Sequence, residues 1–154
     1  MATQPERLPQ AVVDAGRLWA GGVVTAIVAA LVAVVGVLVA RGLLDVPVLA
    51  PSGEGTLGDA STAEMAGLAF IAALLATALL HLLMVAVVQP LRFFGWIVAL
   101  LTALAVLVPF LTDAGTDEQV ATAAIALAIG VTIGSLLSGV ARRSVRGPGL
   151  PPPR

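Results

Sequence analysis

The sequence contains no cysteine and no lysine, and it carries little charge of either sign. The absence of cysteine excludes disulfides, thiol nucleophiles and thiolate ligands for zinc or iron–sulfur clusters. Charged residues make up 11% of the 154 residues and hydrophobic residues 59%, whereas a soluble domain has roughly 25% charged residues. A soluble fold of this length could not bury so much apolar sequence and still cover itself with polar surface. The composition therefore indicates one compact membrane unit.

Four long stretches without any formal charge hold more than half of the chain, at 18–40, 65–91, 93–112 and 119–141. An apolar run of roughly 18 or more uncharged residues predicts a membrane-spanning helix. We expect the spans at about 18–40, 65–88, 93–111 and 119–140. They predict an all-α, four-helix transmembrane bundle with up-down-up-down order. The first run is longer than the apolar core of a signal peptide, so we expect it to remain as an uncleaved anchor.

The arginines predict an orientation with both termini in the cytoplasm, because basic residues accumulate on the inner side of a membrane. In that orientation Arg41 alone lies outside. The arginines on the inside are Arg7, Arg17, Arg92, Arg142, Arg143, Arg146 and Arg154. The predicted organisation is a cytoplasmic tail at 1–16, the four-span domain at 17–141 and an Arg/Pro-rich cytoplasmic tail at 142–154.

Two capping boxes predict helix starts on the external side. In a capping box, a Ser or Thr is followed three residues later by a Glu or Gln, and each side chain bonds to the backbone N–H of the other residue. Ser61 with Glu64 places the start of the second helix near Thr62, and Thr116 with Gln119 places the fourth at about 117. Pro109 predicts a kink or a stop near the outer end of the third helix.

The loops connecting the helices differ in length and composition. The external loop 41–63 begins with an apolar segment that we expect either to lie on the membrane surface or to cap the bundle; Gly53, Gly55 and Gly58 predict a turn after it. Residues 89–92 predict a tight turn that makes helices two and three adjacent and antiparallel. The following aromatic residues predict belts at the cytoplasmic headgroup level: Trp19, Phe93, Phe94 and Trp96.

Small residues recur every four positions in two of the spans, which places them on one helix face where backbones can approach closely. The row in helix four is Thr122, Ala126, Gly130, Gly134 and Ser138, and the row in helix two is Ala69, Ala73, Thr77 and His81. The pattern favours packing inside the chain's own bundle, and a contact between copies is the alternative.

His81 is the only histidine and lies within the second predicted span. An ionisable side chain at that depth usually faces the bundle interior and marks a functional site. Because imidazole titrates near physiological pH, one hypothesis is a proton or ligand site formed by His81 with Thr77. The other is a neutral histidine bonded to a carbonyl or hydroxyl group, since the spans contain no second ionisable group to receive a proton.

Arg142, Arg143 and Arg146 form a basic cluster just after the last span. It either binds anionic lipid headgroups or serves as a topology signal.

No phosphate-binding loop, serine-hydrolase elbow or zinc-protease pattern occurs. The acidic residues Asp113, Asp117 and Glu118, which the predicted orientation places outside, do not form a calcium-binding loop. We therefore expect no enzyme activity, no metal or other cofactor and no nucleic-acid partner.

Three segments resemble a group of actinobacterial four-span membrane proteins classed as a domain of unknown function: 17–22 (RLWAGG), 41–51 (RGLLDVPVLAP) and 90–97 (PLRFFGWI). The resemblance covers roughly residues 15–141 and implies the four-span architecture, but no functional residue. The chain is less similar to the small multidrug transporters, which rely on a carboxylate in their first span.

The sequence as a whole favours a non-enzymatic packing or interaction protein of the bacterial inner membrane. Its partners would be the lipid bilayer and either further copies of itself or another membrane protein. The alternative is a small transporter or channel subunit that uses His81. An accessory subunit of a membrane enzyme is a third possibility.

Overall fold

The computed structural model describes residues 15–51, 57–59 and 62–144, and four long helices make up most of this part of the chain. The helices are α1 (Ala15–Gly42), α2 (Thr62–Ala86), α3 (Pro90–Leu107) and α4 (Thr116–Ser144). A 3-10 helix, η1 (Val108–Leu111), extends α3. All four are long and apolar enough to cross a membrane. The predicted all-α, four-helix class is confirmed.

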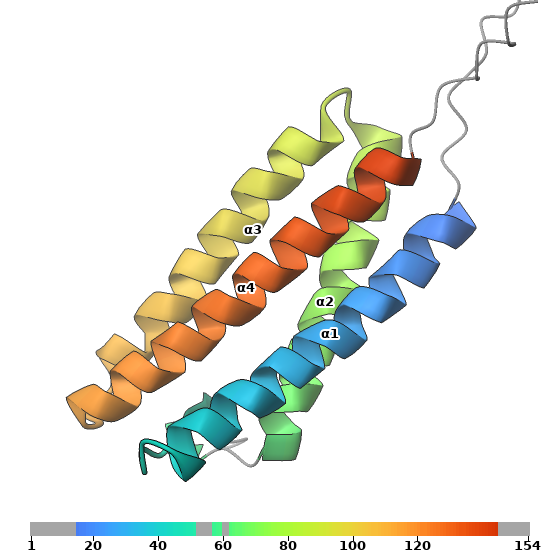
Figure 1. Cartoon of the computed structure of the whole chain (residues 1–154). Coiled ribbons are helices and arrows are strands. Elements are labelled where there is room, and N and C mark those ends of the chain that lie inside the picture. The colour runs from blue at the N-terminus through green and yellow to red at the C-terminus, as the bar shows by residue number, and fades with distance from the viewer. Residues whose placement is uncertain (1–14, 52–56, 60–61, 145–154) are drawn as a thin grey trace, which may run out of the picture.

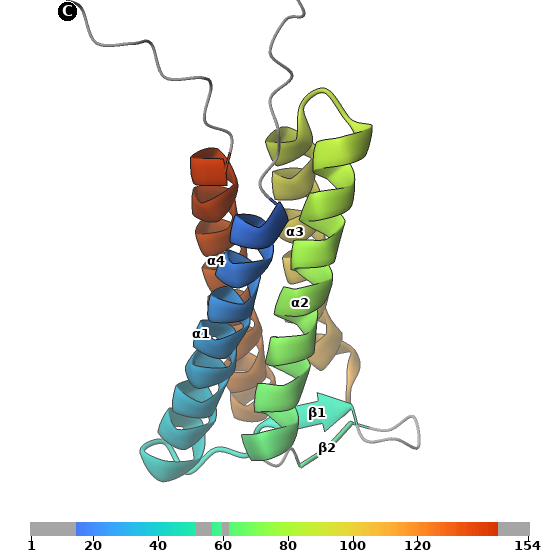
Figure 2. The same cartoon turned by 90° about the vertical axis from the view of Figure 1, so that its right-hand side faces the viewer.

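Consecutive helices run in opposite directions, so α1 begins and α4 ends at the same end of the bundle (Figures 1 and 2). We call this the terminal end. Helix α1 packs along α2 and α4, whereas α3 packs mainly along α4 and less along α2. The α2–α3 pair is joined by the shortest connection, yet it is not the most intimate pair. This looser contact leaves room for the cavity described below.

Many of the buried side chains are small, and many of the large apolar ones are exposed on the outside of the bundle. Ala26, Ala29 and Ala33 of α1 and Ala73 of α2 are fully buried. Thirty large hydrophobic residues of the described chain are exposed, and they occur on all four helices. Water would penalise such a surface, but lipid does not, because helices in a bilayer associate through close packing rather than through the hydrophobic effect. An outer surface that carries many large apolar side chains agrees with a membrane-spanning bundle.

A close contact between α1 and α2 depends on Gly22. A Cβ atom placed there would come within 3 Å of the side-chain atoms of Thr77, which is itself fully buried. The Thr77 hydroxyl donates to the carbonyl of Ala73, at 2.8 Å, and so is satisfied within its own helix. Thr77, from the row of small residues predicted in helix two, thus faces α1.

The turn between α2 and α3 lies at 87–89, two to three residues closer to the N-terminus than the predicted 89–92. Helix α2 ends at Ala86, and α3 already begins at Pro90. Proline is favoured in the first turn of a helix, because its missing N–H would have no partner there. Pro90 therefore starts α3 instead of forming the turn.

The aromatic belt predicted at the start of α3 is partly wrong. Phe93 and Trp96 are exposed, as is Trp19 on α1, but Phe94 is fully buried. Residues one position apart lie on different faces of a helix. Phe94 therefore joins the core at the terminal end, where it is the largest fully buried side chain.

Helix α4 begins at Thr116, and its capping differs from the predicted box. Gly115 precedes the first helical residue, and its carbonyl accepts the backbone N–H of Gln119 at 3.0 Å. The Gln119 side-chain amide donates to the carbonyls of Thr112 and Ala114, at 2.9 and 3.0 Å. Gln119 thus ties the preceding turn to the helix. Helix α2 starts at Thr62 as predicted, but Ser61 of its capping box lies outside the described residues.

The connection between α1 and α2 contains a short antiparallel hairpin at the end opposite the terminal end (Figure 2). Strand β1 (Leu49–Pro51) pairs with β2 (Leu57–Asp59), with Leu49 opposite Asp59. Gly58 belongs to β2 and not to a turn, whereas Gly53 and Gly55 lie outside the described residues.

The later part of the segment leading into β1 caps α1 and α4, one of the two expected placements, whereas Leu43 and Leu44 at its start are exposed. Val48 is fully buried and packs with Val37 of α1 and Ile125 of α4. The backbone N–H of Leu49 donates to the hydroxyl of Thr122 on α4, at 3.1 Å.

Candidate functional site

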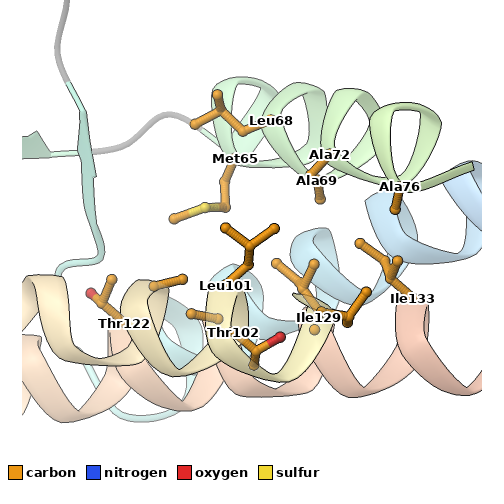
Figure 3. Close-up of a pocket in the computed structure, with 14 residues that line it drawn as sticks. Met65, Leu68, Ala69, Ala72, Ala76, Leu101, Thr102, Thr122, Ile129 and Ile133 are labelled. Carbon is orange, nitrogen blue, oxygen red and sulfur yellow. The ribbon is translucent and has the colours of Figure 1, made fainter. Parts of the chain in front are cut away.

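An apolar cavity of about 260 Å³ lies between α2, α3 and α4 (Figure 3). It extends from Met65, near the start of α2, to Ile133, near the middle of α4. The cavity therefore occupies the half of the bundle that is nearer the hairpin. Figure 3 shows Met65 of α2 and Leu101 of α3 pointing toward one another across it.

The cavity exists because three helices present small side chains to the same space. Those on α2 recur at helical spacing, at Ala69, Ala72 and Ala76, and Ala105 on α3 and Ala126 on α4 face them. Residues three, four and seven apart share a helix face, so the small side chains of α2 lie in a row along one face. Where small side chains of neighbouring helices face one another, they are too short to fill the space between the backbones.

The mouth of the cavity lies along the seam between α2 and α3. Leu68 on α2 and Leu101 on α3 line it and are 42% and 58% exposed, so they border the outside of the bundle. In a membrane that outside is lipid hydrocarbon. The cavity is accordingly reached sideways from the bilayer.

The cavity offers almost no polar chemistry. Its hydroxyl groups come from Thr102 and Thr122. The Thr122 hydroxyl donates to the carbonyl of Glu118, at 2.8 Å, and accepts the N–H of Leu49. Thr122 is thus committed to the hairpin contact. An apolar cavity of roughly 150 Å³ already holds benzene, so this larger one has room for part of a hydrocarbon chain.

The row of small residues predicted in helix four both packs and lines the cavity. Ala126 and Gly130 line it, and Gly130 also meets the side chain of Thr102 on α3, which would overlap any added Cβ. A Cβ at Gly134 would lie 3.3 Å from Val98 on α3. Ser138, farther toward the terminal end, is half-buried. Gly130 and Gly134 are thus used within the bundle.

His81 lies on α2 outside the cavity, five residues beyond Ala76. It is half-buried, and its buried Nδ1 atom has no hydrogen-bond partner among the described residues. Thr77, the predicted companion of His81, points at Gly22 of α1 and bonds to its own helix. The structure therefore does not join His81 and Thr77 through a hydrogen bond.

The three arginines of the predicted basic cluster do not share one environment. Arg142 and Arg143 are exposed in the last turn of α4, and Arg146 lies outside the described residues. Arg143 lines a groove together with Arg17 of α1, but Arg142 does not line it. Within the described part of the chain, no group of three His, Cys, Asp or Glu side chains could hold a metal ion.

Comparison with known proteins assigns a family to this architecture. The model of a family of unknown function, DUF6069, matches residues 13–143. The chain belongs to this family. No protein with curated annotation and no solved structure matches the chain. The match spans all four helices, in agreement with the resemblance found in the sequence.

Membership of DUF6069 brings no functional residue with it, so the candidate site depends on the geometry alone. Sequence reasoning singled out Ala69, Ala126 and Gly130, but as packing residues. It missed Met65, Leu68 and Leu101 as lining residues, and the small residues Ala72, Ala76 and Ala105. A search for stripes of small residues shared by three helices would have indicated the latter set.

Proposed function

We propose that this member of DUF6069 is a non-enzymatic protein of the bacterial cytoplasmic membrane that holds a hydrocarbon chain between α2 and α3. The observation that carries the proposal is the apolar cavity of about 260 Å³ that opens along the α2–α3 seam. An empty space of this kind costs the dispersion contacts of its lining. A lipid acyl chain restores them without desolvating any charged group.

The proposed orientation keeps both termini in the cytoplasm. The arginines of the described helices support it: Arg17, Arg92, Arg142 and Arg143 belong to the terminal end, whereas Arg41 closes α1 at the hairpin end. The cavity then faces the outer leaflet, and its occupant would be drawn from there. The actinobacterial origin proposed from the resemblance is compatible with this placement.

Filling the cavity from within tests the function. In Ala126→Phe the ring occupies the space between the three helices, because Ala126 lines the cavity from α4. We expect a photoactivatable phospholipid in proteoliposomes to label Met65, Leu68 and Leu101 roughly fivefold less than in the wild type, the equivalent of about 1 kcal/mol of lost dispersion contact. Mass spectrometry of the labelled peptides gives the yield.

Ala128→Phe is the matched control, since Ala128 is exposed and lies two residues away on the same helix. It should leave the labelling of the α2–α3 seam at the level of the wild type. Equal labelling in wild type and Ala126→Phe, with both proteins folded, would rule out the cavity as the lipid site.

The alternative, a small transporter or channel, is favoured by one observation: the buried Nδ1 atom of His81 has no hydrogen-bond partner in the part of the chain that the structure describes. Under the leading proposal, we expect purified protein in proteoliposomes to show no pH-dependent flux. His81→Ala and His81→Gln should then behave as the wild type does. A flux in the wild type that both variants abolish would establish transport and displace the leading proposal.

A second copy of the chain or another membrane protein remains a proposed partner. Because Gly130 and Gly134 are already used against α3, the small-residue row of α4 does not by itself supply a surface for one. Any such contact would use the exposed large side chains instead.

A further inference from the structure

A groove of about 530 Å³ runs along the outside of the bundle between α1 and α4, on the half where α1 begins and α4 ends. Its α1 wall includes Gly21 and Val28, and its α4 wall includes Leu136 and Val140. The two helices touch closely along its floor, because any Cβ on Gly21 would overlap the side chain of Val140. The groove is separate from the cavity between α2, α3 and α4.

One end of this groove carries two arginines from opposite ends of the sequence. Arg17 precedes Gly21 by one helical turn, and Arg143 follows Val140 by about one turn, so each shares a face with the apolar wall of its own helix. Both arginines line the groove. The lining thus combines two guanidinium groups at the membrane boundary with an apolar wall that descends from them.

The remaining polar side chain in the lining does not alter this division. The hydroxyl of Thr25 donates to the carbonyl of Gly21, at 2.8 Å, and is used within α1. No carboxylate lines the groove among the described residues. The polar side chains that line it are thus Thr25 and the two arginines.

We propose that this groove binds one anionic phospholipid of the bilayer, with the phosphate between Arg17 and Arg143 and an acyl chain along Val28 and Leu136. Guanidinium groups bind phosphate oxygens in pairs, and basic pockets between transmembrane helices favour anionic lipids. Free phosphate would leave the apolar wall without a partner. The proposal does not depend on the hydrocarbon cavity or on the occupant of that cavity.

Lipid binding to the full-length, delipidated protein in detergent tests the proposal. Native mass spectrometry with phosphatidylglycerol as the probe should give a dissociation constant that rises about fivefold in Arg143→Gln and about fivefold in Arg17→Gln. The dissociation constant of the double variant should rise about 25-fold if the contributions of the two arginines are additive. Phosphatidylcholine should bind more weakly than phosphatidylglycerol to the wild type and respond little to these changes. Rising salt should weaken the binding of phosphatidylglycerol.

Arg142→Gln is the matched control, because Arg142 is exposed next to Arg143 but does not line the groove. It should bind as the wild type does. Val28→Phe narrows the apolar part of the groove without removing charge and should also weaken binding. Its control, Leu31→Phe, lies on the exposed surface of α1 outside the groove and should not.

Several results would overturn the proposal. One is unchanged affinity in the folded Arg143→Gln and Arg17→Gln variants, and another is an equal loss in Arg142→Gln. Equal binding of phosphatidylcholine and phosphatidylglycerol would show that the arginines do not select the headgroup. Inorganic phosphate that competes as effectively as the lipid, with no effect of Val28→Phe, would assign the site to free phosphate. Thermal unfolding of each variant separates a binding defect from a folding defect.

Discussion

Gly22→Leu should separate α1 from α2 and destabilise the bundle by about 3 kcal/mol, the upper end of the cost of overpacking a well-packed core. A Cβ at Gly22 overlaps the side chain of Thr77, including its Cβ atom at 2.9 Å. Thr77 is fully buried and branches at Cβ, so no rotation of its side chain removes the overlap. The free energy of unfolding in a mild detergent measures the effect.

Gly67→Leu is the matched control, because nothing lies within 4 Å of a Cβ at Gly67 on α2. Both substitutions gain roughly the same helix propensity, up to about 1 kcal/mol, so Gly67→Leu should be neutral or stabilising. Gly22→Ala should also lower the free energy of unfolding, because its Cβ overlaps three atoms of Thr77. Adding Thr77→Ala should recover part of that stability, since it removes two of the three atoms. Equal stability of Gly22→Leu and Gly67→Leu would contradict the α1–α2 packing described above.

Phe94→Ala should cost about 3 kcal/mol, near the lower end of the range for soluble cores. The lower end applies because, inside a bilayer, the loss is mainly of packing and not of burial from water. Phe94 is the largest fully buried side chain in the described part of the chain. Its removal opens a void where the start of α3 meets the core at the terminal end. Thermal unfolding in detergent or steric trapping in bilayers gives the magnitude.

The neighbouring Phe93 is the natural control for this change. It has the same side chain in the same helical turn but is 53% exposed, so Phe93→Ala should alter stability by less than about 0.5 kcal/mol, as surface substitutions usually do. A comparable loss from both substitutions would mean that α3 does not present Phe94 to the core.

The site was less accessible to sequence reasoning than the helices were. Each small residue of the cavity looks like a packing residue when its helix is considered alone, as Ala69 and Ala126 did. A stripe of alanines closes tightly against one neighbour and leaves a void against another, depending on the helix that faces it. Likewise Arg17 and Arg143 lie 126 positions apart in the chain, and only the antiparallel pairing of the bundle brings them to one groove.

The sequence by itself determined that this protein has four apolar helices, where they lie to within a few residues, and that small residues recur along the faces of α2 and α4. Length without charge is sufficient for this, because an unbroken apolar run in lipid must satisfy its backbone within a helix. The tertiary structure alone decided which faces meet. It placed Gly22 against Thr77 and Phe94 in the core, left the α2–α3 seam open, and set Arg17 beside the same groove as Arg143. Contacts between helices depend on how each one is rotated about its axis, and every helix here is apolar on nearly all sides, so hydrophobic pattern does not specify that rotation.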